Sequence, residues 1–232
     1  MIELRPHQQD CVNACKQNSF GTITDTCGAG KSYSECALIY DAFQEAGDKS
    51  CVVCYGAHRL DLIDQQYHSL CKYFDGRMDM NDVVILEVSS ASRSGISSTT
   101  NVDGIMKAIE SARKNNHKLL IYFCYASAGK LHNAFRKSIM NTDSNIEHKA
   151  DMIICDEAHF GKMSINESTE AFNTHMFRDV TNRMYFFTAT PTTLTLQHNG
   201  VTTMPIIHEY NYGQALQDNI VLPFTIHWMT EG

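Results

Sequence analysis

Short apolar runs alternate with amphipathic stretches along most of the chain. The apolar runs have the length of buried strands and fall at residues 21–24, 50–55, 83–88, 118–125, 152–156 and 184–188. Stretches with apolar residues at helical spacing lie at residues 31–46, 60–74, 102–115, 130–140 and 168–178. Apolar strands that alternate with helices predict an α/β fold, in which a mostly parallel sheet carries helices on both faces.

Composition narrows the class of protein. The 232 residues suffice for one large α/β domain or two small ones. The formal net charge of −7 argues against a broadly basic nucleic-acid binder but leaves room for a local basic strip. The nine cysteines form no small disulfide framework, and the first residues lack the pattern of a signal peptide. The apolar runs are far shorter than the ~20 residues that cross a bilayer. We therefore expect a soluble intracellular protein, of the cytoplasm, the nucleus or a viral factory, with no membrane partner.

Two cysteine pairs have spacings that metal sites also use. Cys51 and Cys54 flank two valines, but residues three apart in a buried strand point to opposite faces and cannot share a metal ion. Cys11 and Cys15 are one helical turn apart, yet the sequence offers them no second ligand pair. The spacings alone therefore predict no zinc or redox site.

A glycine-rich segment, Asp25-Thr-Cys-Gly-Ala-Gly-Lys-Ser32, follows the first predicted strand. Gly28 and Gly30 allow positive φ angles and a close approach of phosphates to backbone N–H groups, and the helix that follows adds its positive dipole end. Lys31 is placed to contact the β- and γ-phosphates, and the Ser32 hydroxyl to ligate Mg²⁺. The strict phosphate-loop pattern has glycine where this chain has Asp25. A glycine turn that only caps a helix is the alternative.

Two adjacent carboxylates, Asp156 and Glu157, end a later apolar run within Asp156-Glu-Ala-His159, the DEAH segment. Like charges repel, and a cation between them explains their proximity. We expect Asp156 to hold Mg²⁺ and Glu157 to polarise the attacking water, with an exposed acidic turn as the alternative. Thr188 and Thr190 follow the last predicted strand, where they either bridge to the DEAH segment or form a strand-end turn.

All three segments come directly after predicted strands. The carboxyl ends of parallel strands meet at one edge of a sheet, where α/β proteins bind their ligands. The fold alone therefore predicts that the glycine-rich loop, the paired carboxylates and the threonines share one site.

With these segments in this order, the chain resembles the first RecA-like domain of superfamily 2 helicases and translocases over nearly its whole length. The segments that carry the resemblance are Leu4-Arg-Pro-His-Gln8, Cys27-Gly-Ala-Gly-Lys-Ser32, Gly56-Ala-His-Arg-Leu60, Tyr125-Ala-Ser-Ala-Gly129, Asp156-Glu-Ala-His159 and Thr188-Ala-Thr190-Pro191. The third and fourth match the family's motifs loosely.

The resemblance implies a RecA-like P-loop NTPase that uses ATP and Mg²⁺. The residues implied to bind ATP are Arg5, Gln8, Cys27, Gly28, Ala29, Gly30, Lys31 and Ser32, with Gln8 reading the adenine edge. Ser32 and Asp156 are the implied Mg²⁺ ligands, and the implied catalytic residues are Lys31, Asp156, Glu157 and His159. Thr188 and Thr190 are implied to couple hydrolysis to strand movement through His159.

Nucleic acid is the partner that the resemblance implies, with DNA favoured over RNA and the protein acting as a monomer. The candidate contacts are His58, Arg59, Ser127 and Lys130, with Arg93 as the weakest. Such contacts to phosphates position a strand without reading its sequence. We expect most aromatic side chains to lie in the core, and Phe160 is the one that we keep as a candidate for stacking on bases.

Residues 1–220 are expected to form this domain, and residues 221–232 to begin the passage toward a second RecA-like domain. In the family, that second domain supplies arginines that stabilise the transferring phosphate, and such an arginine is worth ~10³–10⁵ in rate. We therefore expect this chain alone to bind ATP and to hydrolyse it slowly.

Other functions remain open. A motor subunit of a restriction or defence enzyme uses the same ATPase core. A non-motor P-loop ATPase or transferase needs neither Gln8 nor the two threonines. A non-catalytic RecA-like scaffold is disfavoured, since Lys31, Asp156 and Glu157 are all present. The many cysteines, asparagines and serines suit a viral or phage gene.

Overall fold

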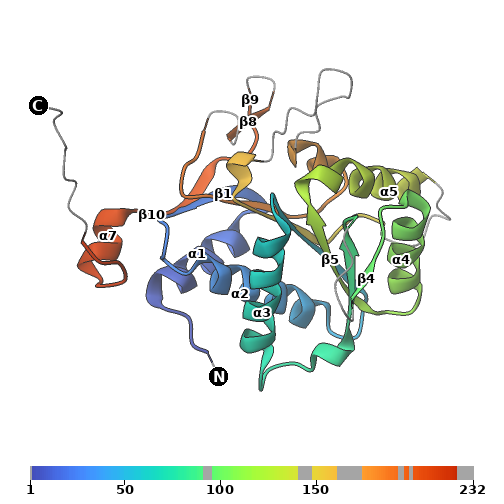
Figure 1. The fold of residues 1–232 in the computed structure, drawn as a ribbon, viewed down its shortest axis with the longest axis horizontal. Coiled ribbons are helices and arrows are strands. Elements are labelled where there is room, and N and C mark those ends of the chain that lie inside the picture. Colours follow the sequence, from blue (N-terminus) through green and yellow to red (C-terminus); the bar gives the residue numbers. More distant parts are fainter. Residues whose placement is uncertain are drawn as a thin grey trace, which may run out of the picture.

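The structure, a computed structural model, describes residues 2–90, 96–140, 148–160, 174–192, 196–198 and 201–223. An eight-stranded sheet in the order β10-β1-β7-β6-β2-β5-β3-β4 forms its centre (Figure 1). All pairings in this sheet are parallel, which confirms the predicted fold class. Its strands are β1 (Phe20–Asp25), β2 (Cys51–Ala57), β3 (Val83–Val88), β4 (Ser97–Ser98), β5 (Lys118–Cys124), β6 (Met152–Asp156), β7 (Met184–Phe187) and β10 (Ile206–Tyr210). A separate antiparallel pair consists of β8 (Gln197–His198) and β9 (Val201–Thr202).

Helices cover both faces of the sheet. The α-helices are α1 (Pro6–Gln17), α2 (Lys31–Ala46), α3 (Leu60–Phe74), α4 (Val102–Lys114), α5 (Ala128–Met140) and α7 (Tyr212–Gln217). Short 3-10 helices are η1 (Met80–Asp82), η2 (Tyr125–Ser127), η3 (Ala158–Phe160) and η4 (Thr174–Asp179). The apolar sides of α1, α2 and α3 pack in one buried cluster, and those of α4, α5 and η4 pack in another.

Strand alternation divides the core between these two clusters. Along β2, Val53 and Tyr55 belong to the first cluster, and Val52 and Cys54 to the second. Cys51 and Cys54 therefore lie on opposite faces of the sheet, as their spacing predicts. Burial of both faces explains why the central strands are apolar nearly throughout.

Two regions differ from the periodicity-based expectation. Where residues 168–178 predict an α-helix, residues 174–179 form the 3-10 helix η4, and residues 168–173 lie outside the described residues. β10 pairs with β1 at the edge of the sheet, and most of its residues are exposed or half-buried. Such a half-solvated edge strand has no continuous apolar run, so the pattern does not reveal it.

The topology places the predicted segments together. β1, β7 and β6 are neighbours in the sheet, and they end at Asp25, Phe187 and Asp156 respectively. The glycine-rich loop, Thr188 and the DEAH segment follow these ends directly. No helix among the described residues is long and apolar enough to cross a membrane.

Candidate active site

The glycine-rich loop joins β1 to the N-terminus of α2. Gly28 and Gly30 have φ angles of 81° and 88°, a left-handed conformation that glycine adopts without strain. Gly30 is the N-cap of α2 and brings no side chain to cap its first N–H groups. The loop therefore presents backbone donors and the positive end of the helix dipole to an anion.

α1 supports this loop from behind. Gln8 Nε2 donates to Gly30 O at 2.8 Å, and the Arg5 N–H donates to Gln8 Oε1 at 2.9 Å. His7 Nε2 lies 2.9 Å from Ala29 O. Gln8 is only 3% exposed, so its amide holds the loop in this conformation. Contact with an adenine edge stays a prediction.

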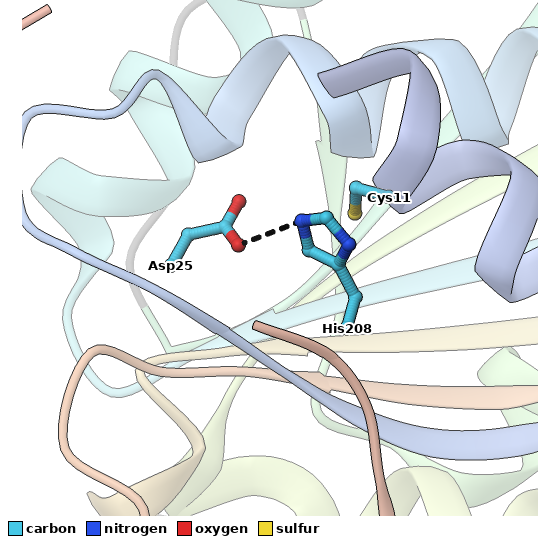
Figure 2. A group of neighbouring side chains, drawn as sticks. All are labelled: Cys11, Asp25 and His208. Atoms are coloured by element: carbon cyan, nitrogen blue, oxygen red, sulfur yellow. Dashed lines mark ion pairs between the residues drawn. The ribbon is translucent and has the colours of Figure 1, made fainter. Parts of the chain in front are cut away.

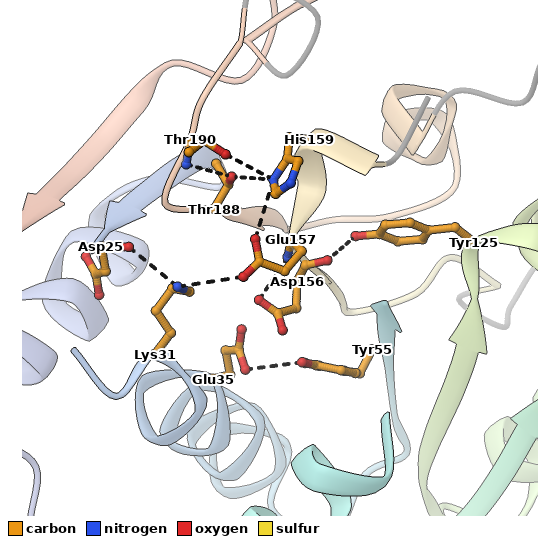
Figure 3. A network of polar contacts seen from close by, with 10 residues as sticks. All are labelled: Asp25, Lys31, Glu35, Tyr55, Tyr125, Asp156, Glu157, His159, Thr188 and Thr190. Carbon is orange, nitrogen blue, oxygen red and sulfur yellow. Dashed lines mark hydrogen bonds and ion pairs between the residues drawn. The ribbon is translucent and has the colours of Figure 1, made fainter. Parts of the chain in front are cut away.

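Lys31 extends from the first turn of α2 toward the DEAH segment (Figure 3). Its Nζ lies 4.0 Å from Glu157 Oε1 and 3.5 Å from the backbone oxygen of Asp25. The side chain is 12% exposed, so its charge acts in a partly desolvated site. The structure thus brings together the lysine and the carboxylate that the sequence places in separate segments.

A third carboxyl group, that of Glu35, joins Asp156 and Glu157 (Figure 3). Burial and then the charge of Glu157 raise the pKa of Asp156, while Lys31 acts in the opposite direction. Burial and then the charge of Asp156 raise the pKa of Glu35 well above its usual range. Three carboxyl groups around one ammonium group leave an excess of acidic groups, and a divalent cation fits such a donor set.

Sequence reasoning missed Glu35 and the tyrosines around this cluster. Glu35 lies one helical turn after Lys31 on α2, so both face the same side, but that spacing is common in any amphipathic helix. Its Oε2 accepts hydrogen bonds from Tyr55 Oη and Gln66 Nε2, both at 3.3 Å. The Tyr125 hydroxyl donates to Asp156 O at 2.6 Å and fixes the end of β6.

Glu157 has a left-handed backbone conformation, with φ of 48°. For a residue other than glycine this conformation costs of order 1–3 kcal/mol, and such strain is concentrated at functional sites. The Glu157 N–H donates to Asp156 Oδ1 at 2.9 Å, so the turn fixes both carboxylates relative to each other.

The threonines after β7 contact the DEAH segment. Thr188, which is fully buried, has its Oγ1 2.9 Å from His159 Nδ1, and Thr190 Oγ1 lies 3.5 Å from the same nitrogen. His159 Nδ1 is also 3.4 Å from Glu157 Oε2. A polar chain therefore runs from Thr188 through His159 to Glu157, and its role in coupling stays a prediction.

The candidate nucleic-acid residues differ in accessibility. Lys130 is exposed, whereas Ser127 is 9% exposed and offers little surface in this conformation. Arg59 forms a bidentate ion pair with Asp61, at 2.9 and 2.5 Å. Arg93 lies outside the described residues.

His58 connects this region with the active site through aromatic rings. Burial and then the charge of Arg59 lower the pKa of His58. Its ring stacks on Phe160 with centroids 4.1 Å apart, and Phe160 lies at the same centroid distance from His159. Phe160, which is 45% exposed, therefore contacts both the DEAH segment and a candidate nucleic-acid residue.

Comparison with known families identifies the family of this chain. The model of the ResIII family, described as the res subunit of type III restriction enzymes, matches residues 1–193. The chain belongs to the ResIII family. This membership confirms the resemblance to superfamily 2 helicases and translocases that the sequence motifs predict. No curated protein sequence matches this ResIII chain.

Solved structures share the fold of this ResIII domain. A nuclease-deletion mutant of the type ISP restriction-modification enzyme LlaGI, in complex with a DNA substrate mimic, matches with a TM-score of 0.65 and 20% identity over 94% of this chain. The DNA-bound type ISP enzyme LlaBIII matches with a TM-score of 0.63 and 18% identity over 94% of the chain. The UvsW helicase from bacteriophage T4 matches with a TM-score of 0.53 and 11% identity over 89%. The ResIII chain spans 21%, 16% and 60% of these proteins respectively.

Proposed function

We propose that this chain is the ATP-binding domain of an ATP-dependent nucleic-acid helicase or translocase. The observation that carries the proposal is the convergence of Lys31, Asp156 and Glu157 beside a glycine loop at the N-terminus of α2. The two threonines in contact with His159 favour a motor over a non-motor P-loop ATPase, which needs no such link.

The residues divide the work of hydrolysis among them. The backbone N–H groups from Gly28 to Ser32 and the Lys31 ammonium bind the phosphates of ATP. Ser32 and Asp156 hold Mg²⁺, which when bound neutralises charge on the phosphate oxygens. Glu157 orients water and accepts its proton. His159, held by Thr188, fixes the Glu157 carboxylate, so a movement of the threonines changes the position of the general base.

The ring stack, formed by His58, Phe160 and His159, connects a bound nucleic-acid strand with the general base Glu157. A strand bound near His58 contacts Phe160 directly or displaces it, and Phe160 lies against His159. DNA is the favoured polymer, since LlaGI and LlaBIII are bound to DNA or to a DNA mimic. We further propose that residues 1–220 act with a second RecA-like domain that supplies arginines to the γ-phosphate, so that this chain alone hydrolyses ATP slowly.

A motor subunit of a restriction enzyme is the second candidate. The ResIII match and the likeness to LlaGI and LlaBIII favour it. Both candidates use the same ATPase site, and stimulation by a polymer is expected in either case. A requirement for DNA that carries a specific short sequence distinguishes the restriction motor from a general helicase.

Direct measurement of Mg-ATP binding tests the site. Lys31→Ala removes a charge-assisted contact worth about 1.5–3 kcal/mol, so ATP affinity is expected to fall roughly 10- to 100-fold. Glu157→Gln is expected to keep ATP affinity and to abolish hydrolysis. Lys49→Ala, at an exposed lysine, is the matched control. Equal ATP affinity of the wild type and Lys31→Ala contradicts the proposed site.

A further inference from the structure

Three potential metal ligands of different chemistry meet behind the glycine-rich loop (Figure 2). Cys11 comes from α1, Asp25 from the end of β1, and His208 from β10. One ligand atom of each lies within 4.8 Å of the other two. Sequence spacing cannot reveal the group, since its members come from three elements far apart along the chain.

The carboxylate of Asp25 is the feature that ordinary packing leaves unexplained. Asp25 is 1% exposed, and neither of its oxygens has a hydrogen-bond partner among the described residues. His208 Nε2 lies 3.3 Å from Asp25 Oδ1, but the two atoms lack hydrogen-bond geometry, and this nitrogen also has no hydrogen-bond partner in the described part of the chain. A buried carboxylate without hydrogen bonds is costly, and its lone pairs call for a positive partner.

Sulfur, imidazole nitrogen and carboxylate oxygen together select the class of metal. Mg²⁺ and Ca²⁺ prefer oxygen ligands, whereas Zn²⁺ accepts all three donor types. Bonds of about 2.0–2.3 Å in a tetrahedral zinc site place its ligand atoms roughly 3.2–3.8 Å apart. The Asp25 to His208 distance of 3.3 Å already meets this spacing. The other two separations are at most 4.8 Å, so they have to shorten by up to about 1–1.6 Å when the metal binds.

We propose that Cys11, Asp25 and His208 form a zinc site that fastens α1 and the edge strand β10 to the strand leading into the glycine-rich loop. Water completes the tetrahedron at the fourth position. On binding, Zn²⁺ replaces the proton of the Cys11 thiol, and this proton passes to solvent. His208 lines a cavity of about 350 Å³ together with His7, Asp10 and Tyr210, which gives the ion a path from solvent.

The alternative is a metal-free buried contact between Asp25 and His208, against which Cys11 packs. The proposal does not rest on the ATPase function. Its ligand atoms are the Cys11 thiol, the Asp25 carboxylate and the His208 ring, whereas Lys31 contacts Asp25 through the backbone oxygen. Because Zn²⁺ displaces the proton of the Cys11 thiol, zinc affinity is expected to rise with pH.

Cobalt substitution tests the site on the intact chain. Chelator-treated protein is titrated with Co²⁺ in the absence of nucleotide, and the spectrum is recorded. The proposal predicts visible bands of tetrahedral cobalt and a near-ultraviolet thiolate-to-cobalt band, both saturating at one equivalent. Cys11→Ser is expected to lose the thiolate band. Asp25→Asn and His208→Gln each remove a ligand of the metal. Loss of a group that only supports a ligand already lowers metal affinity roughly 10–100-fold, so these variants are expected to lower cobalt affinity by at least as much.

Matched controls make the outcome decisive. Cys51→Ser changes another buried cysteine of the same apolar cluster and is expected to leave the cobalt spectrum unchanged. Zinc content of protein purified without chelator, and the rise of Tm on adding Zn²⁺, give second readouts that Asp25→Asn should abolish. Absence of the tetrahedral bands in the wild type overturns the proposal. So does an unchanged cobalt affinity of Asp25→Asn and His208→Gln, which indicates the metal-free ion pair.

Discussion

Replacing Glu35 by glutamine is expected to stabilise the protein progressively as pH rises. The Glu35 carboxyl is fully buried, and burial followed by the charge of Asp156 raises its pKa well above the ordinary value of 4.5. The folded state therefore holds this proton more tightly than the unfolded state does. Its contribution to stability is complete below the unfolded pKa and is lost as pH rises toward the folded pKa. Glutamine carries no charge at any of these pH values.

The size of the effect follows from linkage. Between the pKa of Glu35 in the unfolded state and that in the folded state, each rise of one pH unit lowers the free energy of unfolding of the wild type by about 1.4 kcal/mol. The glutamine carbonyl can still accept from the Tyr55 hydroxyl and Gln66 Nε2, which now contact Glu35 Oε2. The variant is therefore expected to match the wild type below the ordinary glutamate pKa of 4.5 and to exceed it increasingly as pH rises above that value.

Urea unfolding at a series of pH values, without Mg²⁺ or nucleotide, measures this difference. Glu45→Gln, at an exposed position on the same helix, is the control. It removes one surface ion pair with Arg183 and is expected to change stability by less than about 1 kcal/mol. A stability difference between Glu35→Gln and the wild type that does not grow with pH refutes the assignment of a raised pKa to this carboxyl.

Three further variants, one of them with a matched control, test other parts of the site. Thr188→Val removes a buried hydroxyl that contacts His159, so urea unfolding should show a loss of about 1–3 kcal/mol, and polymer-stimulated hydrolysis should fall while ATP affinity is retained. Gly30→Ala places a side chain at a φ of 88°, with its Cβ 2.7 Å from Gln8 Nε2, so the loop has to shift. Titration with ATP should therefore show weakened binding. Gly47→Ala, with a φ of 56° and nothing within 4 Å of its Cβ, carries only backbone strain of order 1–3 kcal/mol and should bind ATP normally. Phe160→Leu is expected to change stability little, because the side chain is 45% exposed, and to lower stimulation of the ATPase by nucleic acid. Equal stimulation of Phe160→Leu and the wild type removes the ring stack from the coupling mechanism.

The overall architecture could be predicted from the sequence because several strands are buried on both faces. β2, β5, β6 and β7 are short apolar runs, and parallel packing then forces the segments after β1, β6 and β7 to one edge. The edge strand β10 could not be predicted in this way, since its half-exposed residues lack the apolar run of a central strand.

The chemistry of the site was only partly contained in local patterns. Lys31 and the DEAH carboxylates belong to short motifs, so their type and order indicate phosphate chemistry directly. Glu35 is one acidic residue on an amphipathic helix, and only the tertiary structure shows that it is buried beside Asp156. The pairing of Asp25 with His208 likewise depends on β10 lying next to β1.

Steady-state ATP hydrolysis, measured on the longest form of the protein that can be purified, tests the motor function most directly. The assay compares no polymer, single-stranded DNA, duplex DNA and RNA, with Lys31→Ala as the inactive variant and Lys49→Ala as the matched control. We expect strong stimulation by one polymer, DNA being favoured, that Lys49→Ala retains and Lys31→Ala abolishes. Hydrolysis that is indifferent to every polymer contradicts a nucleic-acid motor and leaves a P-loop ATPase of another kind.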